Sequence, residues 1–358
     1  MDNTFAAYFL ASNSGKGFYS LFNELYSPHD GWNLYILKGG PGTGKSSIMK
    51  KMADVADNKG YYCEKIYCSS DPDSLDGIII PELKVSVADG TAPHIIEPTY
   101  PGVSEKIINL GDCWDESCLK KNGEHIITLT DCNKALHKRS SRYISAAYAT
   151  LNENIKILAS AFIEDKADNF VTRYITRYAY CNNSYGKETK RFIDATTPKG
   201  IITLADTALN LCDIVISITD EYSAVSGFIM NKMRNFSLSN GIDIITLLNP
   251  INPAGAPRHI ILKKERVGFF TSDSFYNFKP FASRNINAKR FIDDSIFKAH
   301  KAKISFNKKL SENLNSEAIS ILFKAKSVHD DLEKYYVNAT DFDKVNELTE
   351  HLIYETFN

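Results

Sequence analysis

One short segment restricts the fold of this chain more than any other feature. Residues 39–46 read Gly-Gly-Pro-Gly-Thr-Gly-Lys-Ser, which satisfies the pattern G-x-x-x-x-G-K-[ST] in full. The apolar run 34–38 before it predicts a strand, and apolar residues at helical spacing within 48–56 predict a helix after it. A strand, a glycine-rich turn and a helix in this order predict a phosphate-binding loop in an α/β fold.

The residue types of this loop suit a polyphosphate. Glycines let several successive backbone N–H groups point inward, with dihedral angles that a Cβ atom would obstruct. The first turn of the following helix adds unsatisfied N–H groups and the positive end of the helix dipole. We expect Lys45 to bridge the β- and γ-phosphates and the Ser46 hydroxyl to ligate Mg²⁺. The residues expected to bind the nucleotide are Gly39, Gly40, Pro41, Gly42, Thr43, Gly44, Lys45, Ser46 and Ser47.

A carboxylate that helps to hold the metal is expected at the end of a neighbouring strand. Apolar residues alternate over 83–89, which predicts a strand closed by Asp89 at the edge where ligands bind to open α/β sheets. We assign Asp89 to the metal together with Ser46, and to catalysis together with Lys45. Two alternatives stay open. The Asp-Gly pair is also typical of a plain turn, and a rival strand just upstream would offer Glu82 instead.

The residues around the loop favour ATP as the nucleotide, and either slow hydrolysis or transfer of the phosphoryl group to another acceptor. Gly90 follows Asp89, where many ATP-driven motors carry a catalytic glutamate, so we expect slow hydrolysis or transfer to another acceptor. The guanine-reading patterns N-K-x-D and T-K-x-D are missing from the sequence, which favours ATP over GTP. The nearby groups that could orient a nucleophile are Asp71, Asp73, Glu82 and His94, although Asp71-Pro72-Asp73 is more typical of a turn.

The chain also contains an internal repeat. One constant offset places Ile48-Met49-Lys50-Lys51-Met52 on Ile229-Met230-Asn231-Lys232-Met233, and upstream a slightly longer offset places Phe9 on Phe192. A two-residue gap before the strand reconciles the two offsets. The apolar run 214–218 is then the counterpart of the strand 34–38. The repeat predicts a duplicated α/β unit.

The second copy has lost the loop chemistry. Residues 220–227 read Asp-Glu-Tyr-Ser-Ala-Val-Ser-Gly where the first copy has its glycines, lysine and serine. Asp220 and Glu221 put negative charge where phosphates would lie, and Coulomb repulsion opposes binding there. We therefore expect one phosphate-binding loop in the chain, and a second copy that serves as scaffold, regulator or partner surface.

The predicted architecture is α/β, with two P-loop NTPase-like domains that have mainly parallel sheets, each followed by a helical appendage. A length of 358 residues suits two domains. The first domain is predicted to span 1–183 with its appendage at 113–180, and the second to span 184–358 with its appendage at 287–358. Apolar residues at three- and four-residue intervals over 133–161 support the first of these helical regions.

Composition excludes several classes of protein. Lys and Arg total 42 and Asp and Glu total 43, so the net charge of -1 gives no bulk attraction to nucleic acid or anionic membranes. The apolar runs are shorter than the ~20 residues of a membrane-spanning helix, and the N-terminal segment lacks the basic start of a signal peptide. The basic groups at 137–142 and at Arg173 and Arg177 are most simply surface charge.

Cysteine usage indicates a reducing, cytoplasmic environment. The seven cysteines are odd in number and scattered, unlike a secreted disulfide framework. Cys113, Cys118 and Cys132 are alternative metal ligands, but they lack the tight C-x-x-C spacing of structural zinc sites. We interpret the cysteines as small buried hydrophobic residues.

With both halves in view, the chain resembles a family of bacterial tandem P-loop proteins, often labelled simply ATPase or nucleotide kinase, for which no substrate is assigned. The likeness covers nearly the whole chain and is carried by Lys16-Gly17, Gly39 to Ser46, Asp71-Pro72-Asp73, Ile79-Ile80-Pro81-Glu82-Leu83, Asp89-Gly90-Thr91-Ala92-Pro93-His94 and Thr197-Pro198-Lys199-Gly200. The resemblance implies a cytoplasmic nucleotide-binding protein. In that family the second copy is similar to a P-loop domain, whereas here its loop lacks the motif.

Two functions follow as expectations. In the first, the chain is an enzyme whose first half binds ATP and Mg²⁺ and passes the γ-phosphate to water or to a small acceptor. In the second, nucleotide occupancy of the first half is a switch that changes how the degenerate second half meets a protein partner. Binding without turnover would favour the second.

Overall fold

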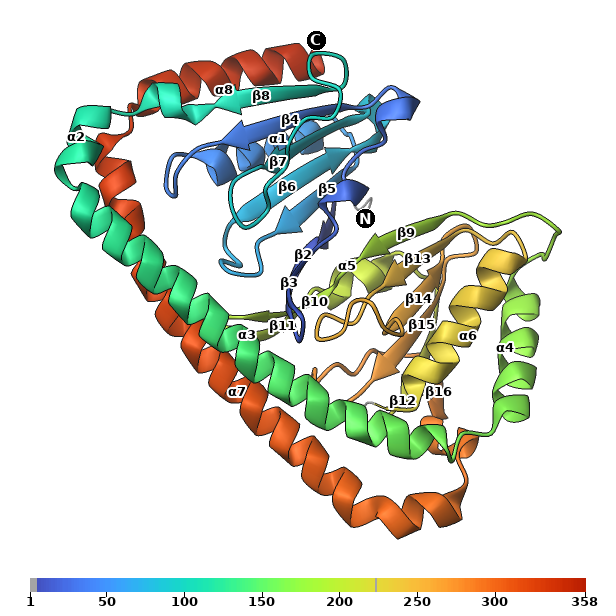
Figure 1. Cartoon of the computed structure of the whole chain (residues 1–358). Helices are drawn as coiled ribbons and strands as arrows, with labels where there is room; N and C mark the ends of the chain where they lie inside the picture. Colours follow the sequence, from blue (N-terminus) through green and yellow to red (C-terminus); the bar gives the residue numbers. More distant parts are fainter. Residues whose placement is uncertain (1–4, 223) are drawn as a thin grey trace.

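The computed structural model describes residues 5–222 and 224–358, and places a six-stranded sheet in each half of the chain (Figure 1). The strands of the first sheet follow the order β1 (Phe5–Tyr8), β5 (Cys63–Tyr67), β6 (Leu75–Ile80), β7 (Val85–Asp89), β4 (Asn33–Lys38) and β8 (Glu105–Asn109). Strand β6 runs antiparallel to both of its neighbours, and the other pairs are parallel.

The second sheet repeats this arrangement strand for strand. Its order is β9 (Glu188–Arg191), β13 (Ile244–Leu247), β14 (His259–Leu262), β15 (Val267–Ser272), β12 (Ile214–Thr219) and β16 (Arg284–Asn287). Only the β14 pairs are antiparallel, at the position that β6 occupies in the first sheet. Two sheets of mainly parallel strands in one shared order confirm that the halves repeat one architecture.

Smaller elements obey the two predicted offsets. The hairpin β2 (Ala11–Ser14) and β3 (Gly17–Ser20) recurs as β10 (Asp194–Thr197) and β11 (Gly200–Thr203), at the offset that places Phe9 on Phe192. Helix α1 (Lys45–Asn58) recurs as α6 (Ser226–Ser239), at the offset that places Ile48 on Ile229. Phe9 and Phe192 exchange two backbone hydrogen bonds, of 2.9 and 3.0 Å, where the two halves meet. The connecting elements are η1 (Phe22–Glu24), η2 (Pro28–Asp30), η3 (Pro81–Leu83), η4 (Leu110–Cys113), α5 (Ala205–Asn210) and η5 (Ala288–Phe291).

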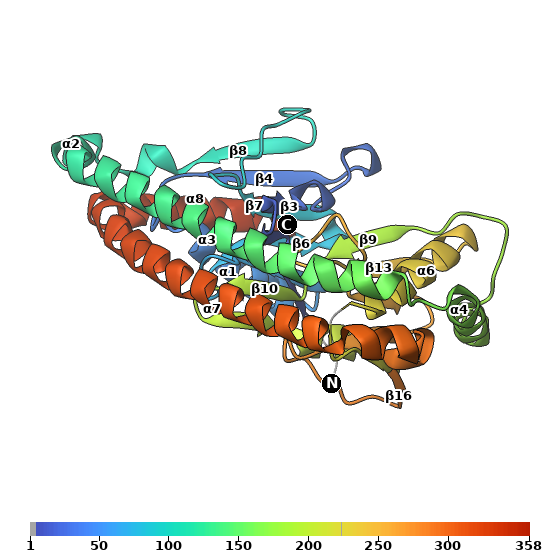
Figure 2. The same cartoon turned by 60° about the horizontal axis from the view of Figure 1, so that its bottom comes forward.

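Each half is followed by helices, as expected within 113–180 and 287–358. These are α2 (Glu116–Lys121), α3 (Gly123–Ala159) and α4 (Glu164–Tyr178), and then α7 (Asp294–Ala339) and α8 (Phe342–Phe357). Helices α3 and α7 pack side by side along most of their length and run in opposite directions (Figures 1 and 2). Small residues at the contact let the two backbones approach closely. Ser140 Oγ donates to Ala318 O and Ser311 Oγ donates to Ala147 O, both at 3.0 Å, so each serine bonds to the backbone of the other helix.

The last helix that follows each half in sequence packs on the other half. Helix α4 packs on α6 of the second half, whereas the C-terminal α8 packs on α1 of the first (Figure 1). Val345, Leu352 and Phe357 of α8 join Met49 and Met52 of α1 in one hydrophobic core. The predicted boundary at 183/184 therefore divides the repeat in sequence, but the packing of helices crosses it.

Three layers of hydrophobic side chains hold the sheets. One lies between the first sheet and the α1–α8 pair, and a second lies between the second sheet and the α4–α6 pair. The third contains residues of both halves, including Phe9, Ile36, Phe192 and Phe270, and joins the two sheets. Within the described residues, no helix has both the length and the apolar character to cross a bilayer.

The cysteines are less uniform than expected. Cys63 and Cys113 are buried, whereas Cys132 is exposed. The interpretation of Cys132 as a buried hydrophobic residue is therefore wrong, because its position on α3 leaves the side chain in contact with solvent.

Candidate phosphate-binding site

The loop that follows β4 has glycine at positions where a side chain would be strained or would collide with a neighbour. Gly42 and Gly44 have φ angles of 69° and 94°, in the left-handed region that side chains disfavour. At Gly39, an added Cβ would lie 2.7 Å from the Thr43 Oγ1 atom. Thr43 Oγ1 in turn donates to Gly40 O at 2.9 Å, which ties the two ends of the loop together. Helix α1 begins at Lys45, as the sequence predicts.

The loop gathers positive character on its inner side. The Lys45 side chain is 9% exposed, and its Nζ atom donates to Gly39 O at 3.0 Å and to Gly40 O at 2.6 Å. The backbone N–H groups from Gly42 to Ser46 have no hydrogen-bond acceptor among the described residues. A cation and several unpaired N–H groups at a helix N-terminus form the arrangement that binds phosphate groups.

Asp89 lies where the sequence places it, beside the loop. Strand β7 runs parallel to β4, with Asp89 opposite Leu37, and Asp89 Oδ2 lies 3.6 Å from Lys45 Nζ. The other carboxylate oxygen, Oδ1, accepts hydrogen bonds from the Thr91 N–H at 2.9 Å and the Thr91 hydroxyl at 2.6 Å. The fixed carboxylate and the lysine therefore face each other at the carboxyl edge of the sheet.

The rival carboxylate is at the wrong end of the sheet. Glu82 accepts a hydrogen bond from the Tyr62 N–H, just before β5 begins, at the opposite edge from the loop. The predicted strand also begins too early, because η3 precedes Lys84, whose positive φ of 54° ends the turn, and β7 starts only at Val85.

The two serines differ in surroundings. The Ser46 Oγ accepts a hydrogen bond of 2.9 Å from the Leu75 N–H, so the hydroxyl is held between α1 and the start of β6. Ser47 is exposed on the first turn of α1. The structure thus fixes the Ser46 hydroxyl next to the loop and leaves the Ser47 side chain in solvent.

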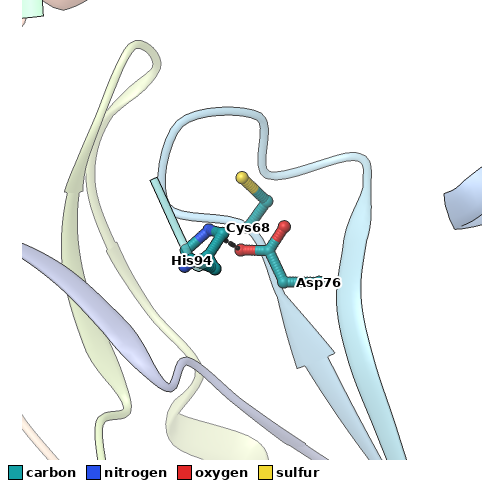
Figure 3. A group of neighbouring side chains, drawn as sticks. All are labelled: Cys68, Asp76 and His94. Atoms are coloured by element: carbon teal, nitrogen blue, oxygen red, sulfur yellow. Dashed lines mark ion pairs between the residues drawn. The ribbon is translucent and has the colours of Figure 1, made fainter. Parts of the chain in front are cut away.

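The groups expected to orient a nucleophile are spread out. Asp71 forms a turn through a hydrogen bond from the Ser74 N–H to its carbonyl, at 2.9 Å, which agrees with the turn interpretation. Asp73 is exposed and pairs with Lys199 of the second half at 2.5 Å, an ion pair that lowers the pKa of Asp73. His94 is buried and its Nε2 lies 3.0 Å from Asp76 Oδ2 (Figure 3).

Helix α7 of the second half covers the loop, which the sequence did not indicate. A Cβ at Gly40 would overlap the ring of Tyr336, and a Cβ at Gly42 would lie 2.5 Å from Cγ of Glu333. We call the side chains of Lys326, Asp330 and Glu333, which follow one side of α7, the α7 ridge. Within it Lys326 pairs with Asp330, and Lys326 Nζ also lies 3.7 Å from Asp71 Oδ2.

The basic residues on the helices are placed mostly as surface charge. Lys138, Arg139, Arg142, Arg173 and Arg177 are exposed, as expected. His137 is the exception, because it is partly buried on α3 near His329 of α7, where burial and then the charge of His329 lower its pKa.

In the second half a carboxylate fills the corresponding loop. Asp220 Oδ2 accepts hydrogen bonds from the N–H groups of Ala224, Val225 and Ser226 at 2.9, 2.7 and 2.7 Å, and Oδ1 accepts from Tyr222 N–H at 3.3 Å. Ser223 lies outside the described residues. Burial raises the pKa of Asp220, although the hydrogen bonds from the backbone oppose the shift.

A cavity of about 290 Å³ adjoins this filled loop, and α3 covers it as α7 covers the first loop. The ends of the two long helices show how they correspond. Trp114 pairs with Thr340 and Phe162 with Ile292, and a single offset that places Trp114 on Ile292 also places Phe162 on Thr340. By that offset the α7 ridge corresponds to uncharged residues of α3, all of which line the cavity: Tyr148, Asn152 and Ile155.

Beside the cavity lies a buried ionic network that the sequence did not reveal. Arg258 Nε donates to Asp194 Oδ2 at 3.0 Å, Arg258 Nη1 donates to Asp273 Oδ2 at 2.5 Å, and the guanidinium lies 3.7 Å from the ring centre of Tyr276. Burial by itself raises the pKa of Asp194, but Arg258, His259 and Thr203 lower it to about 2.

No protein-family model, curated protein sequence or solved structure matches this chain. Its function is therefore inferred from the residues and their geometry.

Proposed function

We propose that the first half of this chain binds ATP with Mg²⁺ at the loop 39–47 and transfers the γ-phosphate to water or to a small acceptor. One observation carries the proposal. Lys45, at the start of α1, and Asp89, at the end of β7, face each other across 3.6 Å, beside a glycine loop whose backbone N–H groups from Gly42 to Ser46 are unpaired among the described residues. This combination suits a metal–polyphosphate complex better than a neutral ligand.

The residues of the loop fit the two groups that the proposal requires. Lys45 would contact the β- and γ-phosphates, because the carbonyl oxygens of Gly39 and Gly40 already hold its ammonium group toward the inside of the loop. Ser46 and Asp89 would hold Mg²⁺, which prefers oxygen ligands. Bound Mg²⁺ neutralises charge that develops on the transferred phosphoryl group. The positive φ angles of the loop glycines support the same assignment, since they turn successive N–H groups inward.

A second candidate function rests on the cover formed by α7. Tyr336 and Glu333 lie directly against the loop glycines and belong to a helix that runs back to the second half. A ligand that moves the loop must therefore also shift α7 or lose contacts with it. This supports a nucleotide-dependent switch in which the second half changes its contacts with a partner.

Calorimetry and a turnover assay on the full chain test both candidates. We expect one Mg²⁺-dependent ATP site per chain, and phosphate release that is slow alone and faster with a suitable nucleoside or nucleotide from a panel. Binding of one ATP without any turnover would favour the switch. No ATP binding would remove both candidates.

A further inference from the structure

A group of three side chains near the candidate site has no role in the proposed function. Cys68 follows β5 directly, Asp76 lies in β6, and His94 lies in the connection that follows β7 (Figure 3). One sulfur, oxygen or nitrogen atom from each residue lies within 4.8 Å of the other two. Three segments that are separate in sequence thus bring a thiol, a carboxylate and an imidazole to one point.

Two buried polar atoms of this group, one on His94 and one on Asp76, lack a hydrogen-bond partner among the described residues. The side chains of His94 and Asp76 are 6% and 7% exposed, and Cys68 is half-buried. Among the described residues, neither His94 Nδ1 nor Asp76 Oδ2 has a partner in hydrogen-bond geometry, although His94 Nε2 approaches Asp76 Oδ2 to 3.0 Å. Burial, followed by the charge of Asp76, raises the pKa of the Cys68 thiol well above its usual range. Buried polar atoms without partners are rare in folded proteins and call for a ligand or another explanation.

We propose that Cys68, Asp76 and His94 bind a zinc-type divalent metal ion. Thiolate, imidazole and carboxylate are the ligands that Zn²⁺ uses in proteins, whereas Mg²⁺ prefers oxygen. Binding replaces the thiol proton, which leaves to solvent, by a metal–sulfur bond, so that the sulfur no longer requires a proton. Three protein ligands leave one position of a tetrahedral ion for water or for a bound group.

The surroundings hold the imidazole in position for such an ion. The ring of Phe22 stacks on His94 with centroids 4.5 Å apart, and the ring of Phe18 meets it edge-on at 4.9 Å. The backbone N–H of His94 donates to Thr91 O at 2.8 Å, which fixes the backbone of the connection. The ring orientation is thus set by packing, as expected for a preformed ligand.

The proposed ion would brace the edge of the sheet beside the loop. Asp76 adjoins Leu75, whose N–H donates a hydrogen bond to the Ser46 hydroxyl. The His94 N–H donates to the carbonyl of Thr91, and the Thr91 N–H in turn donates to the Asp89 carboxylate. Metal binding would thereby restrain the two residues assigned to Mg²⁺. The metal proposal itself rests only on the Cys68 group and stands whether or not the loop binds ATP.

The test uses Co²⁺ as the probe on the full chain after removal of bound metal. We expect one tight site per chain with a sulfur-to-cobalt charge-transfer band, displaced by Zn²⁺ but not by excess Mg²⁺. Cys68→Ser should abolish the band and weaken Co²⁺ binding at least about a hundredfold. Cys63→Ser removes a buried cysteine at the start of β5, the strand that Cys68 follows, and should retain both the band and the Co²⁺ affinity.

Two further measurements guard against a variant that simply misfolds. His94→Ala should weaken binding while circular dichroism stays at the wild-type level, and Zn²⁺ should raise the Tm of the wild type but not of Cys68→Ser. Absence of a tight site in the wild type, or a band that survives in Cys68→Ser, would overturn the proposal.

Discussion

The two loops that follow β4 and β12 begin from the same place in the fold and end in opposite states. In the first, the backbone N–H groups from Gly42 to Ser46 are unpaired among the described residues, and a lysine lies beneath them. In the second, Asp220 accepts four hydrogen bonds from the loop backbone, and the N–H groups of Ala224 and Val225 are among the donors, so the loop is closed around this carboxylate. A helix N-terminus favours negative charge nearby, and in the second half the chain supplies that charge itself.

The second loop shows how a helix N-terminus without the glycine motif is capped by the chain's own carboxylate. A buried helix N-terminus with unsatisfied N–H groups costs stability, so a carboxylate that caps it restores what a bound phosphate would have provided. The side chains that cover the two loops differ in the same way as the loops do. The α7 ridge over the first loop is charged, whereas its counterpart on α3, over the second loop, is uncharged. Four predictions test this contrast.

The largest effect is expected from Lys45→Ala. This change removes the only side-chain cation that contacts the loop carbonyls of Gly39 and Gly40 among the described residues, so we expect ATP affinity to fall about a hundredfold or more. Calorimetry measures the loss. Lys156→Ala, an exposed lysine on α3, is the control and should bind like the wild type. Wild-type affinity in Lys45→Ala would contradict the assignment of the loop.

Asp220→Ala should cost stability without changing nucleotide stoichiometry. Four backbone N–H groups lose their acceptor in a buried place, which we expect to lower the free energy of unfolding by about 1–3 kcal/mol. The ATP stoichiometry should stay at one per chain, as it should for Ser226→Ala, because the loop still lacks a lysine. Urea unfolding and calorimetry measure the two results. Asp213→Ala, which removes an exposed carboxylate just before β12, is the control. A second ATP site in the wild type, lost in Asp220→Ala, would show that the loop is not filled.

The buried network of the second half should make the chain sensitive to acid. The pKa of Asp194 is depressed from 3.8 to about 2, so its contribution is present above pH 3.8 and is lost as the pH falls toward 2. The shift corresponds to roughly 2 kcal/mol. Unfolding measured at about pH 5 and about pH 2.5 should show the loss, and Asp194→Asn should show a smaller difference between the two conditions. An unchanged acid dependence in the variant would assign the effect to other groups.

The smallest effect is expected from Ser46→Ala. The hydroxyl is one of two proposed Mg²⁺ ligands, and we expect its loss to raise the Mg²⁺ concentration needed for ATP binding by about tenfold. A Mg²⁺ titration at constant ATP measures the shift, with Ser47→Ala as the matched control because that side chain is exposed. Equal titrations for both variants would remove Ser46 from the metal site.

The sequence carried the local chemistry well. The glycine motif predicted the strand, the turn and a helix that begins at Lys45, because each depends on residues within a few positions of one another. The alternation before Asp89 placed that carboxylate at the correct edge of the sheet. The repeat predicted the second sheet, since its spacing in sequence survives in the order of the strands.

What the sequence did not predict depends on which helix packs where. The cover of Tyr336 and Glu333 over the first loop requires α7 to cross between the halves, and amphipathic periodicity does not specify the partner of a helix. Cys68, Asp76 and His94 likewise meet only through the pairing of β5, β6 and β7. One sequence signal could have indicated that each long helix covers a loop. The offset that relates α3 to α7 aligns the α7 ridge with the residues of α3 that cover the second loop.

The crossing of α4 and α8 has a consequence for how such a chain could arise. A half-length chain that lent its last helix to a partner, and paired its long helix with the partner's copy, would form a two-fold symmetric homodimer with two identical loops. Joining two such copies end to end preserves every contact while freeing each copy to vary alone. In such a fused chain the second half would be retained for its packing, because its helix α7 covers the first loop and its helix α8 packs on α1.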